Sequence, residues 1–283
     1  NSTRAGTGCD GPEWRRRKKE HVIARRAQPD VAIPRIFRLP NWCNLLSRGL
    51  PEGELPVGQE KPPWGAPVCG LVRNDEHIFA PYSAEDMSGK KINKQKLQEL
   101  LDLPQTDDVP LIAMVTRLVS HKGLDLVKAR LDAIMKFGVQ MVVLGSGDYE
   151  YESFMGEIAQ RYPDNFRLRT GFIPDLAHKI YAGSDIFLMP SKSEPCGLSQ
   201  MVALRYGSIP VVRETGGLRD TITDSGAGDG NGFTFCDYNA DTMAHTVYRA
   251  VQGYADREGW QTLVKRAMEC DNSWGASANA YIR

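Results

Sequence analysis

The sequence contains no long hydrophobic run. Its 283 residues include no apolar stretch of the ~18 residues that a membrane-spanning helix needs. Residues 1–40 also lack the apolar segment of a secretory signal peptide. We therefore expect neither an integral membrane protein nor a secretory leader, and no membrane partner.

Charge of either sign is not in excess. The chain has 35 Lys and Arg and 35 Asp and Glu, a formal net charge of zero. Proteins that bind nucleic acid or anionic membranes usually carry a basic excess, so both functions are disfavoured. The balance is uneven along the chain, because residues 1–40 hold ten Lys and Arg against four Asp and Glu. A basic head therefore precedes a mildly acidic body.

Spacings typical of metal sites are missing. The six cysteines form no Cys-x-x-Cys pair and lie at no zinc-site spacing from the five scattered histidines. No Asp-x-Asp occurs either, which disfavours a metal-held nucleotide-sugar site. We expect no metal and no cofactor, and we interpret the cysteines as free thiols in a reducing cytoplasm.

Residues 1–81 differ in composition from the rest of the chain. Five consecutive cations occupy Arg15–Lys19, and proline and glycine recur while apolar periodicity is poor. Such a segment buries too little apolar surface to offset the entropy of ordering, which predicts an irregular or disordered head. A nuclear-import or anion-binding tail is the alternative. We therefore divide the chain into a head, 1–81, and a folded domain, 82–283.

From about residue 93, strand-like and helical segments alternate. Apolar runs predict buried strands, and apolar residues at helical spacing predict the helices between them. This alternation is typical of an α/β fold with a Rossmann-like parallel sheet flanked by helices. Ligands bind such sheets at the carboxyl ends of the strands. The predicted strands are 111–118, 139–144, 165–170, 185–190 and 208–212, and the predicted helices 94–101, 123–137, 150–161, 174–182, 197–206, 239–253 and 257–270.

The loop after the first predicted strand carries two cations. Arg117 and Lys122 lie five positions apart, just before a predicted helix. A planar guanidinium and a compact ammonium can together hold one anionic group, such as a diphosphate. The alternative is a pair of surface cations, although cations at a helix start oppose the helix dipole.

The loop after the fourth predicted strand is the most informative. Its sequence, Ser191-Lys-Ser-Glu-Pro-Cys-Gly-Leu-Ser-Gln200, opens a helix whose free amides would attract an anion. Gly197 permits a ligand to approach the backbone closely. Glu194 can accept hydrogen bonds from sugar hydroxyls or face developing positive charge. Its alternative role is a favourable charge near the helix start, contributing ~0.5 kcal/mol.

Other glycine and aromatic positions after predicted strands have simpler alternatives. Gly147, in Gly145-Ser-Gly147, resembles the start of a dinucleotide fingerprint but fits a tight turn equally well. Phe172 can stack on a base, although a core position is commoner for phenylalanine. The pair Gly216-Gly217 indicates a close backbone approach or only the start of a helix.

Longer motifs recur in order from about Tyr82 to Arg283. They are Tyr82-Ser-Ala-Glu-Asp-Met-Ser-Gly-Lys90, Thr116-Arg-Leu118 with Lys122-Gly-Leu-Asp125, Leu144-Gly-Ser-Gly-Asp148, Ile180-Tyr-Ala-Gly-Ser-Asp185, Glu194-Pro-Cys-Gly-Leu-Ser-Gln200, Ala203-Leu-Arg-Tyr-Gly207, Thr215-Gly-Gly-Leu218 and Ser273-Trp274. Together they resemble the bacterial glycogen synthase and starch synthase family. The resemblance implies the C-terminal, donor-binding half of a GT-B fold. It also implies a cytoplasmic enzyme that transfers glucose from ADP-glucose to the non-reducing end of an α-1,4-glucan, with retention and without a metal.

The resemblance further implies roles for individual residues. Arg117 and Lys122 are similar to the pair that holds the donor diphosphate and stabilises the leaving ADP, and Glu194 to the acidic residue facing the glucose. These three are the predicted catalytic residues. The predicted donor-binding residues line the glucosyl pocket, offer amides to the phosphate or stack on adenine; they are Gly147, Phe172, Cys196, Gly197, Leu198 and Ser199.

The chain departs from the wider pattern at several points. Val202 stands where many GT-B relatives carry the second Glu of Glu-x7-Glu, as expected of the glycogen synthase branch. Phe172 replaces a tyrosine and keeps only its stacking face. Residues 1–81 contain no Lys-x-Gly-Gly-Leu loop, so we expect the donor-binding half alone, with any N-terminal domain in another chain. A non-catalytic ADP-sugar-binding module and another GT-B transferase are the alternatives.

Overall fold

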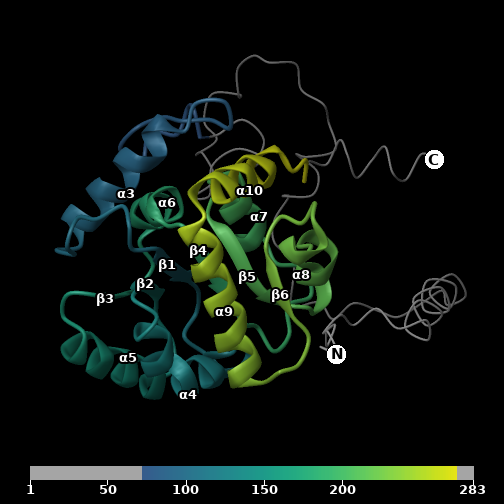
Figure 1. Ribbon diagram of the computed structural model, residues 1–283. Helices are drawn as coiled ribbons and strands as arrows, with labels where there is room; N and C mark the ends of the chain where they lie inside the picture. Colours follow the sequence, from purple (N-terminus) through teal and green to yellow (C-terminus); the bar gives the residue numbers. More distant parts are fainter. Residues whose placement is uncertain (1–71, 273–283) are drawn as a thin grey trace, which may run out of the picture. The chain divides into compact units, whose positions relative to one another are not determined.

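A six-stranded parallel sheet forms the centre of the protein. The computed structural model describes residues 72–272 (Figure 1), so the predictions for residues 1–71 and for Ser273-Trp274 lie outside the described residues. The strand order is β3-β2-β1-β4-β5-β6. The strands are β1 Leu111–Val115, β2 Gln140–Gly145, β3 Phe166–Thr170, β4 Ile186–Met189, β5 Ile209–Arg213 and β6 Phe233–Phe235.

The central strands are buried on both faces, which explains their unbroken apolar sequences. β1 pairs with β2 along its whole length, from Leu111 opposite Gln140 to Val115 opposite Leu144. On its other side it pairs with β4. Because no residue of β2 or β4 reaches solvent, an alternating polar pattern has no place in these strands. The predicted Rossmann-like parallel sheet is confirmed.

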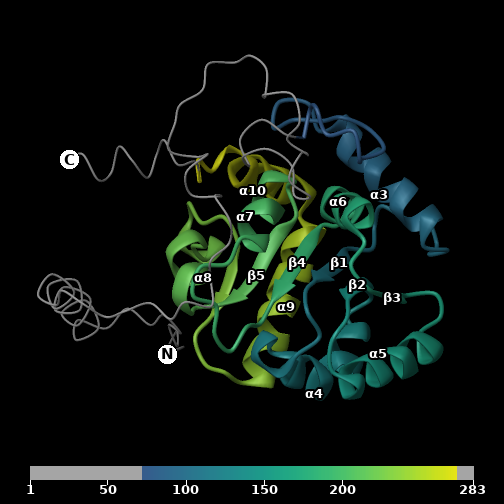
Figure 2. The same cartoon turned by 180° about the vertical axis from the view of Figure 1, so that it is seen from behind.

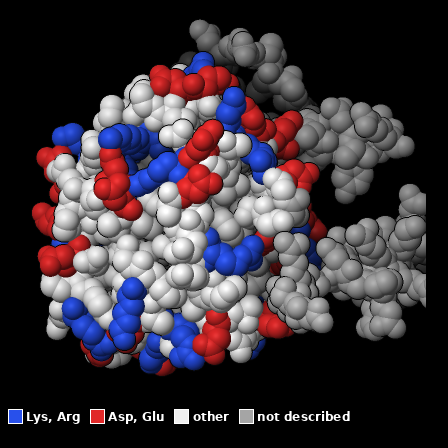
Figure 3. Space-filling view, viewed as in Figure 1, with Lys and Arg blue, Asp and Glu red and all other residues white. Residues whose placement is uncertain are grey.

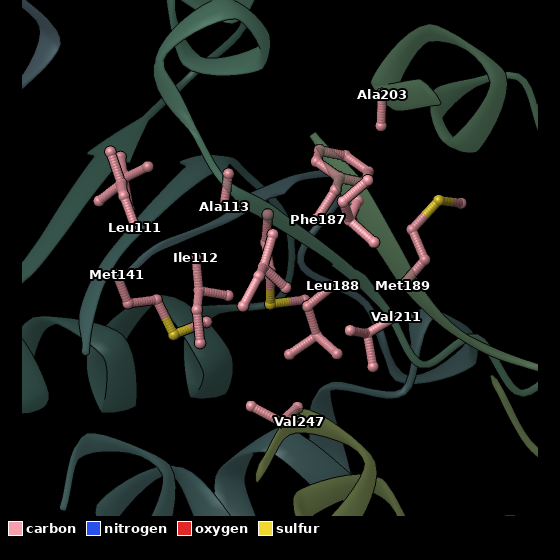
Figure 4. Packing of buried hydrophobic residues seen from close by; sticks show 14 of the residues in the cluster. Leu111, Ile112, Ala113, Met141, Phe187, Leu188, Met189, Ala203, Val211 and Val247 are labelled. Atoms are coloured by element: carbon pink, nitrogen blue, oxygen red, sulfur yellow. The ribbon is translucent and has the colours of Figure 1, made fainter. Parts of the chain in front are cut away.

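Helices cover both faces of the sheet (Figures 1 and 2). Figure 4 shows Ala203 of α7 on one side and Val247 of α9 on the other, with Phe187 directed toward α7 and Leu188 toward α9. Helices α4 and α9 pack together on one face, and α6 packs with α3 on the other. The helices are α3 Ser88–Leu100, η1 Ser120–Lys122, α4 Leu124–Met135, α5 Tyr149–Arg161, α6 Pro174–Gly183, α7 Ser199–Arg205, α8 Gly216–Thr221, η2 Ser225–Ala227, α9 Ala240–Ala255 and α10 Arg257–Glu269.

The predicted elements differ from the observed helices and strands mainly at α3, α8 and β6. The short helix α8 is absent from the predicted set, although the start of a helix is one interpretation of Gly216-Gly217. Helix α3 begins at Ser88 rather than Lys94, so the Tyr82–Lys90 motif runs into its first turn. Strand β6 is absent from the predicted set, because the sequence Phe-Thr-Phe is too short to show a period. It extends the sheet beyond β5, and the loop that follows it reaches the carboxyl edge.

The Tyr82–Lys90 motif anchors the chain to the amino-terminal edge of the sheet. Tyr82 donates its hydroxyl hydrogen to the carbonyl oxygen of Tyr206 at 2.8 Å. The Lys90 ammonium donates to four carbonyl oxygens at 2.7–3.4 Å, those of Tyr181, Ala182, Ser184 and Tyr206. These carbonyls end α6 and α7, where a cation is favoured by the helix dipoles. This part of the resemblance therefore has a structural explanation.

Residues 72–81, which the sequence assigns to the head, also contact the domain. The Asp75 carboxylate accepts hydrogen bonds from His178 Nδ1 at 2.8 Å and from the Tyr206 hydroxyl at 2.5 Å. Burial alone would raise the pKa of Asp75, but these bonds and one from the His77 amide outweigh it and lower the pKa to about 2. With Val72 buried as well, folded contacts extend beyond the predicted boundary at residue 82.

Charged side chains of both signs are interspersed over the face seen in Figure 3. The surface of the described residues also carries ion pairs, such as Arg161 with Asp132 at 2.7 Å and Lys128 with Glu150 at 2.7 Å. Exposed pairs of this kind contribute about 0–1 kcal/mol each. Neither sign dominates the described part of this face.

Candidate functional site

The predicted site residues lie together at one edge of the sheet. Arg117 and Lys122 follow β1, Gly147 follows β2, Phe172 follows β3, and Glu194 follows β4. Because all six strands are parallel, their carboxyl ends meet at this edge. The fold therefore brings four separate loops together, as a ligand site in such a sheet requires.

Lys122 and Glu194 form an ion pair across two of these loops. The Lys122 Nζ lies 2.5 Å from Glu194 Oε2, and the side chains are only 18% and 11% exposed. Ser191 donates its hydroxyl hydrogen to the same carboxylate oxygen at 3.3 Å. Lys122 ends η1, and Gly123 follows with φ 78°, where a Cβ atom would overlap the Pro190 carbonyl. Close packing of the β1 and β4 loops thus places the two charges in contact.

Arg117 occupies a more open position on the β1 loop. Its Nη2 lies 3.4 Å from Nε2 of His121, which belongs to the same loop. The His121 carbonyl in turn accepts a hydrogen bond from the Lys192 amide at 2.9 Å, linking the β1 loop to the β4 loop. The guanidinium is exposed at the edge of the sheet, where an anionic ligand can reach it.

The segment after Glu194 presents several predicted donor-binding residues to solvent. Cys196 is an exposed free thiol, and Leu198 is 66% exposed. Gly197 has φ +71°, a left-handed conformation that favours glycine. Ser199 is the first residue of α7, whose N-terminus has no side-chain cap. Cys196 and Leu198 are thus accessible, whereas Gly197 is buried where the backbone turns before the helix.

The Gly216-Gly217 pair packs directly against the backbone of this segment. The Gly217 amide donates to the Glu194 carbonyl at 3.2 Å. A Cβ atom at Gly216 would overlap the Glu194 carbonyl, and one at Gly217 would overlap the Cys196 carbonyl. The pair therefore serves a close backbone approach, in addition to starting α8.

The remaining predicted residues differ in their surroundings. Gly147 forms a parallel bridge with Leu118, and a Cβ atom there would overlap the Leu118 carbonyl, so close packing accounts for this glycine. Phe172 is 66% exposed in the turn before α6. A core position for Phe172 is therefore wrong, and its ring is accessible for stacking.

Arg213 and Tyr238 are site-adjacent residues that the sequence did not single out. Arg213 ends β5 and donates to the Ser191 carbonyl at 3.0 Å and to the Lys192 carbonyl at 2.5 Å. Tyr238 follows β6 and donates its hydroxyl hydrogen to Asp125 of α4. Burial and this hydrogen bond raise the pKa of Tyr238 well above its usual value. Arg213 lies two residues before the Thr215-Gly-Gly-Leu218 motif, whereas nothing local to Tyr238 indicates its contacts.

Cysteine, metal and membrane predictions have separate outcomes. Cys196 and Cys270 carry free thiols, whereas Cys236 is disulfide-bonded, so the expectation that every cysteine is free is wrong for Cys236. Residues 72–272 contain no group of three His, Cys, Asp or Glu arranged to hold a metal ion. Among the helices of that range, none is long and apolar enough to cross a membrane.

A surface hollow lies away from this edge. It measures about 490 Å³ and is lined by residues of η2, α9 and α10, among them His245, Arg249 and Trp260. It shares no residue with the loops after β1 to β4. The carboxyl edge is the better candidate site, because it gathers the paired charges, an exposed thiol and close-packed glycines at the place where parallel α/β sheets bind ligands.

Comparison with known proteins finds similarity to glycogen synthases and to a starch synthase. The sequence is 52% identical over 209 residues to glycogen synthases of Bacillus cereus (strain ATCC 10987 / NRS 248) and Desulforamulus reducens, covering 73% of this chain and 44% of each relative. The chain thus spans less than half the length of these relatives. Among solved structures, the catalytic domain of starch synthase IV from Arabidopsis thaliana, bound to ADP and acarbose, superposes with a TM-score of 0.70 at 37% identity. It covers 75% of this chain and 45% of that one.

A more distant structure shares the fold alone. Sucrose-phosphate synthase from Thermosynechococcus elongatus is 22% identical, with a TM-score of 0.52, covering 66% of this chain and 46% of that one. The family model described as "Glycosyl transferases group 1" matches residues 98–265, which is more than half of the 283 residues. This match takes in the β1 and β4 loops with Lys122 and Glu194, and the chain belongs to the family of group 1 glycosyl transferases.

Proposed function

We propose that this chain binds ADP-glucose at the carboxyl edge of its sheet and provides the donor side of glucosyl transfer to the non-reducing end of an α-1,4-glucan. The observation that carries the proposal is the partly buried Lys122–Glu194 pair, with Arg117 on the same loop as Lys122. Similarity to glycogen synthases and to a starch synthase supports the donor and acceptor classes.

The charges at this edge suit the departure of a nucleoside diphosphate. Bond cleavage leaves negative charge on the diphosphate and positive charge on the glucosyl carbon. Lys122 and Arg117 would stabilise the first, and Glu194 would face the second. Fixed charges stabilise such developing charges more strongly where water is partly excluded, and both members of the ion pair are less than one-fifth exposed. Retention of the anomeric configuration belongs to the same proposal.

The donor would meet the Lys122–Glu194 ion pair when it enters the site. Lys122 neutralises a carboxylate that would otherwise repel the diphosphate. On binding, the ammonium would share its hydrogen atoms between Glu194 and a phosphate oxygen. The Ser191 hydroxyl, 3.3 Å from the same carboxylate oxygen, would keep Glu194 partly satisfied during that exchange.

The other predicted residues would contact the rest of the donor. The exposed Phe172 ring would stack on adenine, and Cys196 and Gly197 would line the glucosyl pocket. Backbone amides of Gly197, Leu198 and Ser199 would approach the phosphate. We also propose that the reaction needs no metal and that the enzyme prefers ADP-glucose to other nucleotide sugars. Cytoplasmic residence is a further part of the proposal.

Calorimetric titration with ADP, ADP-glucose and UDP-glucose tests this function directly. We expect both adenine ligands to bind and UDP-glucose to bind at least tenfold more weakly. Preference for UDP-glucose would indicate another transferase of the same fold. Absence of binding to all three ligands, in a chain shown to be folded by its thermal unfolding, would refute a donor site. Added EDTA should leave ADP-glucose binding unchanged if no metal takes part.

A further inference from the structure

The Lys122–Glu194 contact requires the β1 and β4 loops to keep a fixed position relative to each other. Glu194 lies in a segment without regular structure, between β4 and α7, whereas Lys122 ends η1 just before α4. Both side chains are flexible, so their contact depends on where the two backbones are held. The contact therefore depends on the groups that hold the β4 loop near α4.

Arg213 holds the β4 loop from the neighbouring strand. Its Nε donates to the Ser191 carbonyl at 3.0 Å and its Nη2 to the Lys192 carbonyl at 2.5 Å. A third bond runs from Nη1 to the Cys236 carbonyl at 3.4 Å. One guanidinium thus binds the backbone of two loops at once, which the single nitrogen of lysine cannot reproduce.

Tyr238 connects Arg213 to the other side of the site. Its ring centroid lies 5.5 Å from the Arg213 guanidinium carbon and 5.5 Å from the Lys192 ammonium. Cations at this distance from an aromatic face are attracted by its quadrupole. Its hydroxyl donates to Asp125, in the first turn of α4 and three residues after Lys122. A chain of contacts therefore runs from α4, through Tyr238 and Arg213, to the loop that carries Glu194.

We propose that Arg213 and Tyr238 are positioning residues that hold Glu194 against Lys122 for glucosyl transfer. The inference rests on the proposed function for its catalytic meaning, but the contacts themselves do not. Neither residue needs to touch the donor. A separate hydrogen bond, from the Lys192 amide to the His121 carbonyl at 2.9 Å, involves neither residue. Loss of one tie should therefore loosen the loop without releasing it.

The test compares conservative variants with matched controls elsewhere in the fold. Arg213→Lys keeps the charge but loses the fork, and Tyr238→Phe keeps the ring but loses the bond to Asp125. The control for the first is Arg167→Lys, because Arg167 also donates to backbone carbonyls, including that of Leu101 at 2.6 Å. The control for the second is Tyr162→Phe, because Tyr162 also donates its hydroxyl hydrogen to an aspartate, Asp132, at 2.8 Å.

Two measurements on the full chain separate positioning from function. Hydrogen exchange of the amides in 191–197 reports loop order and needs no ligand. We expect Arg213→Lys to speed it about tenfold and Tyr238→Phe about threefold, with no change in either control. Titration with ADP reports the site, and we expect affinity losses of about tenfold and threefold. In the Lys122→Ala background these losses should shrink to under twofold, which a general loss of stability would not produce.

The outcomes distinguish the two proposals. Unchanged exchange in both Arg213→Lys and Tyr238→Phe would overturn the positioning role whether or not ADP binds. Tyr238→Phe removes a single oxygen atom, so it keeps the test decisive if Arg213→Lys fails to fold. Faster exchange with unchanged ADP affinity would also overturn the role in transfer. A parent chain that binds no ADP would refute the proposed function, while the exchange result would still report on the loop contacts.

Discussion

The ammonium of Lys122 lies 2.5 Å from the carboxylate of Glu194, although 72 positions separate them in the sequence. The contact joins the loop after β1 to the loop after β4, which are neighbouring strands of the sheet. A cation and an anion are thus held together at the edge where ligands bind in parallel sheets. Each charge changes what the other can do, and the first two predictions depend on this.

Replacing Lys122 with alanine should weaken ADP binding without unfolding the protein. Loss of one charge-assisted contact to the diphosphate costs ~1.5–3 kcal/mol, or about one to two decades in the dissociation constant. Calorimetric titration measures the change. Lys128→Ala is the control, because Lys128 pairs with Glu150 on the surface at 2.7 Å and lies outside the site. Equal affinity in the Lys122 variant and the parent would remove Lys122 from the donor site.

Replacing Glu194 with glutamine should also weaken ADP binding. The amide keeps the size of the side chain but loses the charge that holds the Lys122 ammonium in place, so we expect affinity for ADP to fall about three- to tenfold. The same titration checks this, with the exposed Glu150→Gln as the control. A rise in affinity would mean that the Glu194 charge mainly repels the nucleotide, and it would also contradict the positioning role proposed for Arg213 and Tyr238.

The Cys196 thiol should be protected by the donor. It is exposed two residues after Glu194, so bound ADP-glucose should slow its modification by a thiol reagent at least fivefold, and ADP should slow it less. Peptide mass spectrometry of the labelled chain follows each site separately. Cys270, the other free thiol within residues 72–272, is the internal control and should react at the same rate throughout. If ADP-glucose leaves the Cys196 rate unchanged, this thiol does not lie beside the donor.

Stability at acid pH should depend on Asp75. Its pKa is lowered from 3.8 to about 2 in the folded protein, so it stabilises the fold above pH 4, and this contribution is lost as the pH falls toward 2. The shift corresponds to ~2 kcal/mol at pH 7. Asp75→Asn should therefore lower the free energy of unfolding at pH 7, with a much smaller difference at pH 2. Urea unfolding at both pH values measures this, and a loss of equal size at pH 7 and pH 2 would mean that the charge of Asp75 is not what stabilises the fold.

Lys90 should be far more important for stability than its neighbour Lys91. Lys90→Met leaves four carbonyl oxygens without this donor, and a buried acceptor left unsatisfied costs about 1–3 kcal/mol. Lys91→Met breaks only a surface ion pair with Asp107 and should cost under about 1 kcal/mol. Thermal and urea unfolding compare the two variants. Similar losses would mean that water replaces the Lys90 contacts.

The sequence predicted the parallel sheet because its central strands are buried on both faces. Ile112, Val143 and Leu188 belong to runs that are apolar throughout, which is a local property. Those parts of the site that lie in loops directly after predicted strands, such as Glu194, could be predicted, because ligands bind at the carboxyl ends of parallel strands. Strand order is not local, however, so the sequence did not indicate that the β1 and β4 loops touch. Tyr238 could not be found, because it follows β6, which is too short to show a pattern.

Phe172 illustrates a different limit. Its position after a strand predicted either a stacking ring or a core residue, and composition favours the core. The structure leaves the ring 66% exposed. Exposure depends on how far the turn projects beyond the sheet, which neither periodicity nor propensity records.

Gly216 and Gly217 set a limit on how this site could be redesigned. No methyl group fits beneath the backbone of Glu194 and Cys196, so the underside of the segment is shaped by the lack of side chains. Changes to either glycine would displace the main chain that carries both residues, and would alter every contact of that segment at once. A laboratory search for altered sugar preference is therefore better directed at solvent-facing positions such as Leu198, which can vary one at a time.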